Sequence, residues 1–415
     1  MNICLVILSD GWGGAETATY ELTRHLRDEG QNVSIILNDE IFKYYSKIEN
    51  VKLFNVGHLF SPQSLVKLYL FPQKEGNAKH KRPSNRVALL LRSYMADIFT
   101  CIRLKQTRKE VLQFLSYNEI ELIHSHLVDA AIMVSNLKNL EIPFVLTTHG
   151  EHYIRGVPQP HPLLIPQIKW KAKIFRQALE KADKIIDVSA YMIQVWQNWD
   201  HSLNKDKFTI IHNGVNLTEI QETTKLTLKE KGKFNLLFPG GAKFIKGGDL
   251  LVKSLPNVKK AIPDIHVYIA LDVPQNSLLR KMVNDLDLEQ NVTFVGFLQP
   301  EKYLETLNSV DALILPSRIE AFAITVIEAM ALGKPVITSN TGGIPEIIKE
   351  GRNGILVEPE PDQIARAIIY LYENEGLRKK ISQNNREDVI NYDWKPIVKQ
   401  YMAVYRELIE EAQTK

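Results

Sequence analysis

Two glutamates, Glu320 and Glu328, stand with seven residues between them in the stretch RIEAFAITVIEAMALGKPVITSNTGGIPE, residues 318–346. The apolar run after Glu320 predicts a helix that begins near Phe322, which places Glu328 about 9 Å along its axis at about 1.5 Å per residue. The free N–H groups at such a helix start favour a diphosphate. An acid on each side could accept hydrogen bonds from hydroxyls, and a nucleotide sugar carries hydroxyls on both sides of its diphosphate.

The same two acids also have a plainer interpretation. Glu320 could stabilise the helix macrodipole, and Glu328 could be a surface acid. A bare pair at this spacing favours that interpretation. The small residues Ala321 and Ala323 nevertheless leave room for a ligand to approach the backbone.

The segment SDGWGGAETATYELTRHL, residues 9–26, is a second candidate anion site, because it follows an apolar run and opens a helix. Gly11, Gly13 and Gly14 allow a tight turn in front of the helix N-terminus. The spacing is not G-x-G-x-x-G, so a dinucleotide site is weakly supported. A plain strand-to-helix turn fits equally well.

A lysine follows another glycine turn in FPGGAKFIKGGDLL, residues 238–251. Gly240 and Gly241 predict the turn, and Lys246 could reach a phosphate as a point charge. Taken alone, such a lysine is more often a solvated loop residue.

Two histidines end predicted strands in ELIHSHLVD and VLTTHGEHY. His126 and His149 would lie at the carboxyl ends of these strands, where open α/β sheets bind ligands. A lone histidine is more often structural, but two at one edge make a functional role equally plausible. They are too far apart in sequence to indicate a metal site.

The elements that must position these residues alternate between short apolar runs and amphipathic helical stretches. Continuous Val, Ile and Leu runs are typical of strands buried on both faces. Strands separated by helices imply parallel sheets, and two such sets indicate two doubly wound domains. The predicted strands are 3–8, 33–37, 121–125, 143–148, 184–189 and 208–212 in the first half, and 234–240, 266–270, 292–296, 312–316, 335–339 and 354–358 in the second.

The domain boundary is predicted near residues 213–232, where the chain turns polar after an Asn-Gly pair. We therefore expect domains at 1–213 and 214–395. The segment 391–412 is predicted to be helical after Pro396 and carries a broad apolar stripe. This last helix could pack on either domain.

Length and composition fit an ordinary globular protein. The 415 residues predict two or three domains, and 45% hydrophobic with 24% charged residues is unexceptional. A net charge of +3 gives no global argument for nucleic acid. No apolar stretch of about 18 residues predicts a membrane span. The two cysteines, Cys4 and Cys101, form neither a disulfide framework nor a metal-ligand spacing, so we expect a cytoplasmic, reducing location.

Residues 67–109 are strongly basic, with eleven Lys and Arg against Glu75 and Asp97, about +9 in one segment. The charge is mixed with Leu, Tyr, Met and Phe. Such a mixture can bind an anionic membrane surface, which would place the protein at the cytoplasmic face of a membrane. A solvated helix with basic residues on its outer face is an equally good interpretation.

The block from Glu320 to Pro359 resembles the donor-site region of retaining glycosyltransferases of the GT-B fold, family four. It holds E-x₇-E, then E-A-M-A-x-G-x-P-V-I, G-G-x-x-E and a G-x-L-V strand. Further agreements, in the same order along nearly the whole chain, are GGAE, H-x-H, T-x-H-G, KIIDVS, IIHNGV, KG, VGF and LPSR.

The resemblance implies two Rossmann-like domains across a cleft, with the acceptor on the first and the donor on the second. By this resemblance Glu328 binds the ribose, Glu320 faces the sugar hydroxyls and Lys246 binds the diphosphate. The remaining implied residues are Phe322, Ala323 and Ile324 as backbone contacts to sugar and phosphate, Gly13 and Gly14 lining the cleft, His149 near the transferred sugar, and His126 and Trp12 on the acceptor side. The resemblance also implies retention at the anomeric carbon, no metal or other cofactor, and a last helix that crosses back to the first domain.

Two departures from the family pattern bear on the donor. E-A-F-A replaces the usual E-G-F-G, so the Ala323 methyl narrows the space near the sugar. The arginine usual before Lys246 is missing, and Gly240 and Gly241 occupy its neighbourhood. Lys243 could supply the lost charge, or the donor could be held differently.

The sequence thus predicts an enzyme that moves a sugar from a nucleotide sugar, a UDP-sugar being favoured, to a glycan or lipid-linked acceptor in cell-surface polysaccharide or glycolipid synthesis. No protein nucleophile is evident, which agrees with the front-face displacement that the family resemblance implies. Two alternatives remain: a nucleotide-sugar epimerase of the same fold and a non-catalytic nucleotide-sugar-binding scaffold. The sequence names neither the base, the sugar nor the acceptor.

Overall fold

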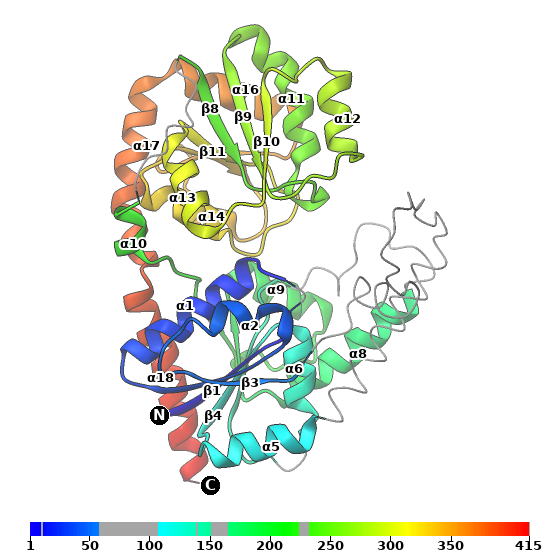
Figure 1. The fold of residues 1–415 in the computed structure, drawn as a ribbon, viewed down its shortest axis with the longest axis vertical. Helices are drawn as coiled ribbons and strands as arrows, with labels where there is room; N and C mark the ends of the chain where they lie inside the picture. Colours follow the sequence, from blue (N-terminus) through cyan, green and yellow to red (C-terminus); the bar gives the residue numbers. More distant parts are fainter. Residues whose placement is uncertain (10, 58–106, 138–139, 151–164, 224–231, 415) are drawn as a thin grey trace, which may run out of the picture. The chain divides into compact units, whose positions relative to one another are not determined.

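The computed structural model describes residues 1–9, 11–57, 107–137, 140–150, 165–223 and 232–414. These residues form two compact units, each with its own parallel sheet (Figure 1). The first unit comprises 1–188, 193–211 and 398–415, and the second comprises 189–192 and 212–397. The basic segment 67–109 lies almost wholly outside the described residues.

The first unit is built on a seven-stranded parallel sheet with the order β3-β2-β1-β4-β5-β6-β7. Its central strands are almost completely buried because helices cover both faces, which explains their continuous apolar sequences. The strands are β1 (Asn2–Ile7), β2 (Asn32–Leu37), β3 (Lys52–Asn55), β4 (Leu122–His126), β5 (Phe144–Thr147), β6 (Lys184–Asp187) and β7 (Phe208–Ile210).

The helices of the first unit are amphipathic and bury their apolar faces on the sheet. In α1, for example, Leu22 and Leu26 are fully buried one turn apart. The helices are α1 (Gly14–Asp28), α2 (Asp39–Tyr45), α5 (Arg108–Tyr117), α6 (Val128–Ser135), α8 (Ile165–Lys181), α9 (Ala190–Trp199), whose first residues belong to the second unit, and the C-terminal part of α18 (Trp394–Gln413).

The second unit has a six-stranded parallel sheet with the order β10-β9-β8-β11-β12-β13. Its strands are β8 (Phe234–Phe238), β9 (Ile265–Ala270), β10 (Val292–Gly296), β11 (Ala312–Leu315), β12 (Val336–Ser339) and β13 (Ile355–Val357). Its helices are α10 (Leu217–Gln221), α11 (Gly248–Ala261), α12 (Leu278–Asp285), α13 (Pro300–Ser309), α14 (Ile324–Ala331), α15 (Ile344–Ile347), α16 (Pro361–Glu373) and α17 (Glu375–Asp388).

Both sheets reverse their strand order at one point. Chain order runs outward from β1 to β3 on one side and from β4 to β7 on the other, and the second sheet reverses in the same way between β8 and β11. In doubly wound sheets, ligands bind beyond the carboxyl ends of the strands at this switch point. The loops after β1 and β4, and after β8 and β11, are therefore the expected ligand-binding loops.

The predicted fold class, two doubly wound α/β domains, is confirmed. Some details of the prediction were wrong. The helix after Glu320 begins at Ile324 instead of Phe322, because Ala323 has extended backbone dihedrals and occupies the N-cap position. The last helix begins at Trp394 instead of after Pro396, since a proline in the first turn lacks only an N–H that has no helical partner.

Candidate functional site

The loop after β11, which carries Glu320, rests on the glycine pair after β12. A side chain at Gly342 would place its Cβ 1.8 Å from the Glu320 carbonyl oxygen, and one at Gly343 would meet the Ala321 carbonyl oxygen at 2.2 Å. The Gly343 N–H donates to the Glu320 carbonyl at 3.0 Å. The glycines therefore allow two loops to pack backbone against backbone, which fixes the position of Glu320.

Glu346 ends the same glycine motif and has a structural role. Its carboxylate accepts the N–H groups of Ala190 and Tyr191, both at 3.0 Å, and lies 3.3 Å from His212 Nε2. The His212 ring stacks on Phe322, with ring centroids 5.3 Å apart. Phe322 is buried by this stack, so its side chain is committed to packing.

Arg318 joins the loop after β11 to the loop after β8. Its guanidinium donates two hydrogen bonds of 2.7 Å to the Asp249 carboxylate and one of 2.7 Å to the Phe244 carbonyl. The guanidinium also stacks on the Phe244 ring at 3.9 Å, and the Arg318 N–H donates to the Ile245 carbonyl. This clamp holds the short turn Phe244–Lys246 against the acidic loop.

The clamp brings Lys246 to Glu320. Lys246 Nζ lies 2.5 Å from Glu320 Oε2, and the Ser317 hydroxyl donates to the same oxygen at 3.3 Å. Glu320 is 6% exposed. Among the described residues, no donor reaches the other carboxylate oxygen, Oε1. Glu320 and Lys246, which the family resemblance assigns to the sugar and the diphosphate, thus form one ion pair. This pair leaves Glu320 Oε1 available as a hydrogen-bond acceptor.

Glu328 lies on α14 and is half-buried. Burial raises the pKa of its carboxyl from 4.5 to about 7. Within the described parts of the chain, its carboxylate has no hydrogen-bond or ion-pair partner. The start of the same helix carries no side-chain cap, and Phe322, Ala323 and Ile324 are buried there. The N–H groups at the start of α14 and the Glu328 carboxylate therefore both have unused hydrogen-bonding capacity. An anionic ligand that carries hydroxyl groups would satisfy both.

The other candidate residues of the glycine turn after β8 differ in their exposure to solvent. Gly240 and Gly241 are buried in the turn, whereas Lys243 is exposed at its surface. No described residue pairs with the Lys243 ammonium. It lies three residues before Lys246 and caps the short turn through its backbone only.

In the first unit, the glycines after β1 and the two predicted histidines lie at the carboxyl ends of β1, β4 and β5. Gly13 is the N-cap of α1 and, like Gly14, is exposed. Trp12 is half-buried and packs on Tyr44 with ring centroids 4.2 Å apart. Its packing onto other aromatic rings leaves only part of the indole exposed to a ligand.

His126 and His149 are in direct contact. His126 Nδ1 lies 2.9 Å from His149 Nε2, and the rings stack at 5.2 Å. Burial lowers the pKa of His149 from 6.5 to about 3 and that of His126 well below its ordinary value. Both rings are therefore neutral near pH 7, so one nitrogen donates to the other. His149 has the left-handed dihedral φ of 54°, a conformation that costs a non-glycine residue about 1–2 kcal/mol.

Sequence reasoning missed a buried carboxylate at the same sheet edge. Asp187 ends β6 and is 0% exposed; its Oδ1 accepts a hydrogen bond from the Thr148 hydroxyl, next to His149, and one from Trp196 Nε1 at 3.4 Å. Burial raises the pKa of Asp187 from 3.8 to about 7. The sequence KIIDVS contains the signal, an acid inside an apolar run.

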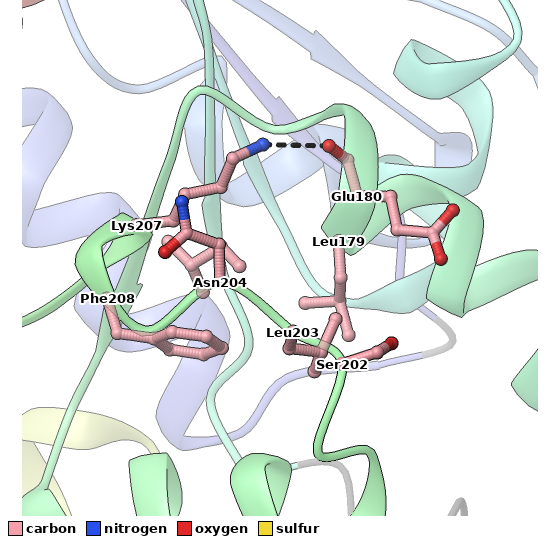
Figure 2. A pocket seen from close by; sticks show the side chains of 8 residues that line it. Leu179, Glu180, Ser202, Leu203, Asn204, Lys207 and Phe208 are labelled. Carbon is pink, nitrogen blue, oxygen red and sulfur yellow. Dashed lines mark hydrogen bonds between the residues drawn. The ribbon is translucent and has the colours of Figure 1, made fainter.

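A small cavity of about 140 Å³ lies elsewhere in the first unit (Figure 2). It is lined by Leu179, Glu180, Ile185, Ser202, Leu203, Asn204, Lys207 and Phe208. These residues precede or begin β6 and β7, at the opposite edge of the sheet from His149. Lys207 Nζ donates to the Glu180 carbonyl at 2.8 Å, which caps the end of α8. The cavity is a packing feature remote from the switch point.

No three His, Cys, Asp or Glu side chains gather as a metal site would require, within the residues that the structure describes. The metal-free reaction implied by the family resemblance stays a prediction. None of the described helices has the length and apolar character needed to cross a membrane.

Two family models match the chain and together cover most of it. The model described as Glycosyltransferase Family 4 matches residues 12–219, and the model described as Glycosyl transferases group 1 matches residues 219–388. An uncharacterised glycosyltransferase of Methanocaldococcus jannaschii is 32% identical over 296 residues, which cover 70% of this chain and 76% of that protein.

Solved structures share the fold at lower identity. Sucrose-phosphate synthase from Thermosynechococcus elongatus superposes with a TM-score of 0.75 at 20% identity and covers 99% of both chains. The Anabaena protein HepE in complex with UDP-glucose superposes with a TM-score of 0.70 at 18% identity, covering 98% of this chain and 100% of that one.

Proposed function

The chain belongs to the family 4 glycosyltransferases of the GT-B fold, and we propose that it transfers a sugar from a nucleotide sugar, in the first place a UDP-sugar, with retention of the anomeric configuration. The proposed acceptor is a glycan or a lipid-linked saccharide of a cell-surface polysaccharide or glycolipid. A UDP-sugar is favoured because the structural neighbour HepE was crystallised with UDP-glucose.

The Lys246–Glu320 pair beside the start of α14 is the observation that carries the proposal. An ammonium has three N–H groups, and Glu320 takes one of them, so the others remain for a diphosphate. Glu320 Oε1 has no donor among the described residues and can accept a sugar hydroxyl. Glu328 lies four residues after the first residue of α14 and supplies a second free acceptor, for the ribose.

In the proposed reaction, the bond between the anomeric carbon and the phosphate oxygen breaks, and the leaving diphosphate keeps the electron pair. The acceptor oxygen bonds to the same face of the anomeric carbon, and its proton passes to the departing phosphate oxygen. Negative charge grows on the diphosphate during this step. Lys246 and the α14 N-terminus would stabilise that charge because fixed positive groups need no reorganisation as the reaction proceeds.

His149 is proposed to form a hydrogen bond with the transferred sugar. Its Nε2 is engaged by His126, so its Nδ1 is the nitrogen left for substrate. A neutral ring in this environment would act as a hydrogen-bonding group and not as a charge. The glycines Gly13 and Gly14 are proposed to line the same edge.

Calorimetry with UDP and UDP-glucose on two variants tests the donor assignment. Glu328→Gln should weaken both ligands about equally, by roughly tenfold to a hundredfold, because a charge-assisted hydrogen bond contributes about 1.5–3 kcal/mol. Glu320→Gln should weaken UDP-glucose more than UDP, since Glu320 faces the sugar. Glu289→Gln, at an exposed position on the opposite sheet edge, is the matched control.

Three results would contradict this assignment. Unchanged UDP binding by Glu328→Gln would remove the ribose role, and equal losses of UDP and UDP-glucose by Glu320→Gln would remove the sugar role. Failure of the wild-type protein to bind UDP, GDP or ADP would overturn the nucleotide-sugar donor. Product analysis with UDP-glucose, with and without a glycolipid extract, separates transfer from epimerisation and from binding without turnover.

A further inference from the structure

Tyr303 lies on α13 and Glu328 on α14, two helices that pack against each other (Figure 1). Both side chains carry unused hydrogen-bonding capacity. The Tyr303 hydroxyl is buried, and no described residue forms a hydrogen bond with it. The Glu328 carboxylate likewise has no partner in the described chain. A buried hydroxyl without a partner costs about 1–3 kcal/mol, so a folded protein rarely keeps one without a reason.

The two side chains lie on packed helices and influence each other electrostatically. Burial raises the pKa of the Tyr303 phenol well above its ordinary value, and the Glu328 charge adds a smaller effect in the same direction. No hydrogen bond joins the phenol to the carboxylate, although one is a donor and the other an acceptor. A group that both donates and accepts hydrogen bonds would complete the arrangement.

An alcohol hydroxyl is such a group, because it offers one donor and accepts through its lone pairs. We propose that Tyr303 and Glu328 hold one ribose hydroxyl of the donor nucleotide from both sides, with the hydroxyl donating to Glu328 and accepting from Tyr303. The inference rests on the proposed function, since it assigns the nucleotide ribose to this end of the second unit. It adds a ligand contact from α13, an element that the E-x₇-E motif does not include.

The chemistry limits the ligand. A phosphate oxygen or a base carbonyl could accept from Tyr303, but neither can donate to a carboxylate. A ribose hydroxyl satisfies both groups at once. The pair should therefore distinguish a ribonucleotide from the matching deoxyribonucleotide.

The test is calorimetry with UDP, 2′-deoxy-UDP and 3′-deoxy-UDP on wild type and Tyr303→Phe. The variant should bind UDP roughly threefold to tenfold more weakly, the loss of about one neutral hydrogen bond. For the analogue that lacks the bound hydroxyl, wild type and variant should bind equally, because the partner of the phenol is already gone. Tyr370→Phe, at an exposed position on α16, is the matched control.

Thermal unfolding without nucleotide supplies a second readout. Tyr303→Phe should melt at the same or a higher temperature than wild type, because it deletes a buried hydroxyl that has no partner. A purely structural hydroxyl would instead make the variant less stable, and that result would overturn the proposal.

The binding outcomes separate this inference from the function beneath it. If Tyr303→Phe binds UDP as wild type does while Glu328→Gln is impaired, the Tyr303 role is wrong and the donor site stands. Equal tenfold losses for UDP and both deoxy analogues would also overturn the shared-hydroxyl geometry. If wild type binds neither UDP, GDP nor ADP, the proposed function fails and the inference fails with it.

Discussion

Asp187→Asn should remove a strong pH dependence from the stability of the first unit. The native carboxyl keeps its proton up to about pH 7, whereas the unfolded carboxyl loses it near 3.8. The native state therefore binds more protons between these values, so this stabilising contribution is fully present below about pH 4 and is lost as the pH rises through about 7. Asparagine does not titrate and leaves the acceptor for the Thr148 hydroxyl in place.

The magnitude follows from the two pKa values. Their difference, about 3 pH units, corresponds to about 4 kcal/mol at about 1.4 kcal/mol per unit. The free energy of unfolding of wild type relative to Asp187→Asn should thus fall by about 1.4 kcal/mol per pH unit between pH 4 and pH 7. By pH 8, wild type should have lost most of this free energy of unfolding relative to Asp187→Asn.

Urea unfolding followed by tryptophan fluorescence at half-unit steps from pH 4.5 to pH 8.5 measures this difference. Trp196 is buried beside Asp187 and reports on the first unit. Other titrating groups, such as Glu328 and the buried histidines, are common to both proteins and cancel in the difference. Asp206→Asn, at an exposed position, should track wild type at every pH. A difference between wild type and Asp187→Asn that does not change with pH would refute the reasoning.

Three further predictions concern turnover and membrane binding. Lys246→Ala should lower turnover more than Lys243→Ala. If both cations act on one diphosphate, the effects of the two substitutions should be non-additive in the double variant. Full activity of Lys243→Ala at all donor concentrations would show that the Lys243 side chain is only solvated. His126→Phe keeps a ring but not the bond to His149, so turnover should fall roughly threefold to tenfold with unchanged UDP affinity; unchanged steady-state kinetics would count against it. Segment 67–109 should bind anionic vesicles in a co-sedimentation assay. Each basic residue near the surface should contribute about 1 kcal/mol of binding free energy, and added salt should weaken the binding. Equal recovery on neutral vesicles would argue against a membrane role.

The sequence predicted the parallel sheets because strands buried on both faces leave long runs of Val, Ile and Leu. It did not predict β3 (Lys52–Asn55), which lies at the sheet edge, with both end residues exposed and the two middle residues only half-buried. An edge strand covered on one side needs no continuous apolar run. The helix after Glu320 was placed two residues early because an apolar run does not reveal where the backbone leaves the extended conformation.

The candidate site was predictable where a motif names its residues and unpredictable where it depends on distant contacts. Lys246 and Glu320 were singled out separately, but their ion pair joins residues 74 positions apart and requires the Arg318 clamp. Tyr303 gave no signal, because a tyrosine on an amphipathic helix ordinarily indicates packing. Only the free hydroxyl in the folded structure sets it apart from a core residue.

The Lys246–Glu320 pair also explains how the site is balanced in charge. A half-buried ammonium near the positive end of α14 places two groups of the same sign close together. Glu320 offsets them, and its own desolvation is offset by Lys246 and Ser317. Neutralising Glu320 therefore increases the net positive charge at the site, which favours a diphosphate, while it removes the acceptor for the sugar. Because of this opposition, Glu320→Gln is expected to lower the affinity for UDP-glucose more than the affinity for UDP. Glu328→Gln, distant from the ion pair along α14, is expected to lower both affinities alike.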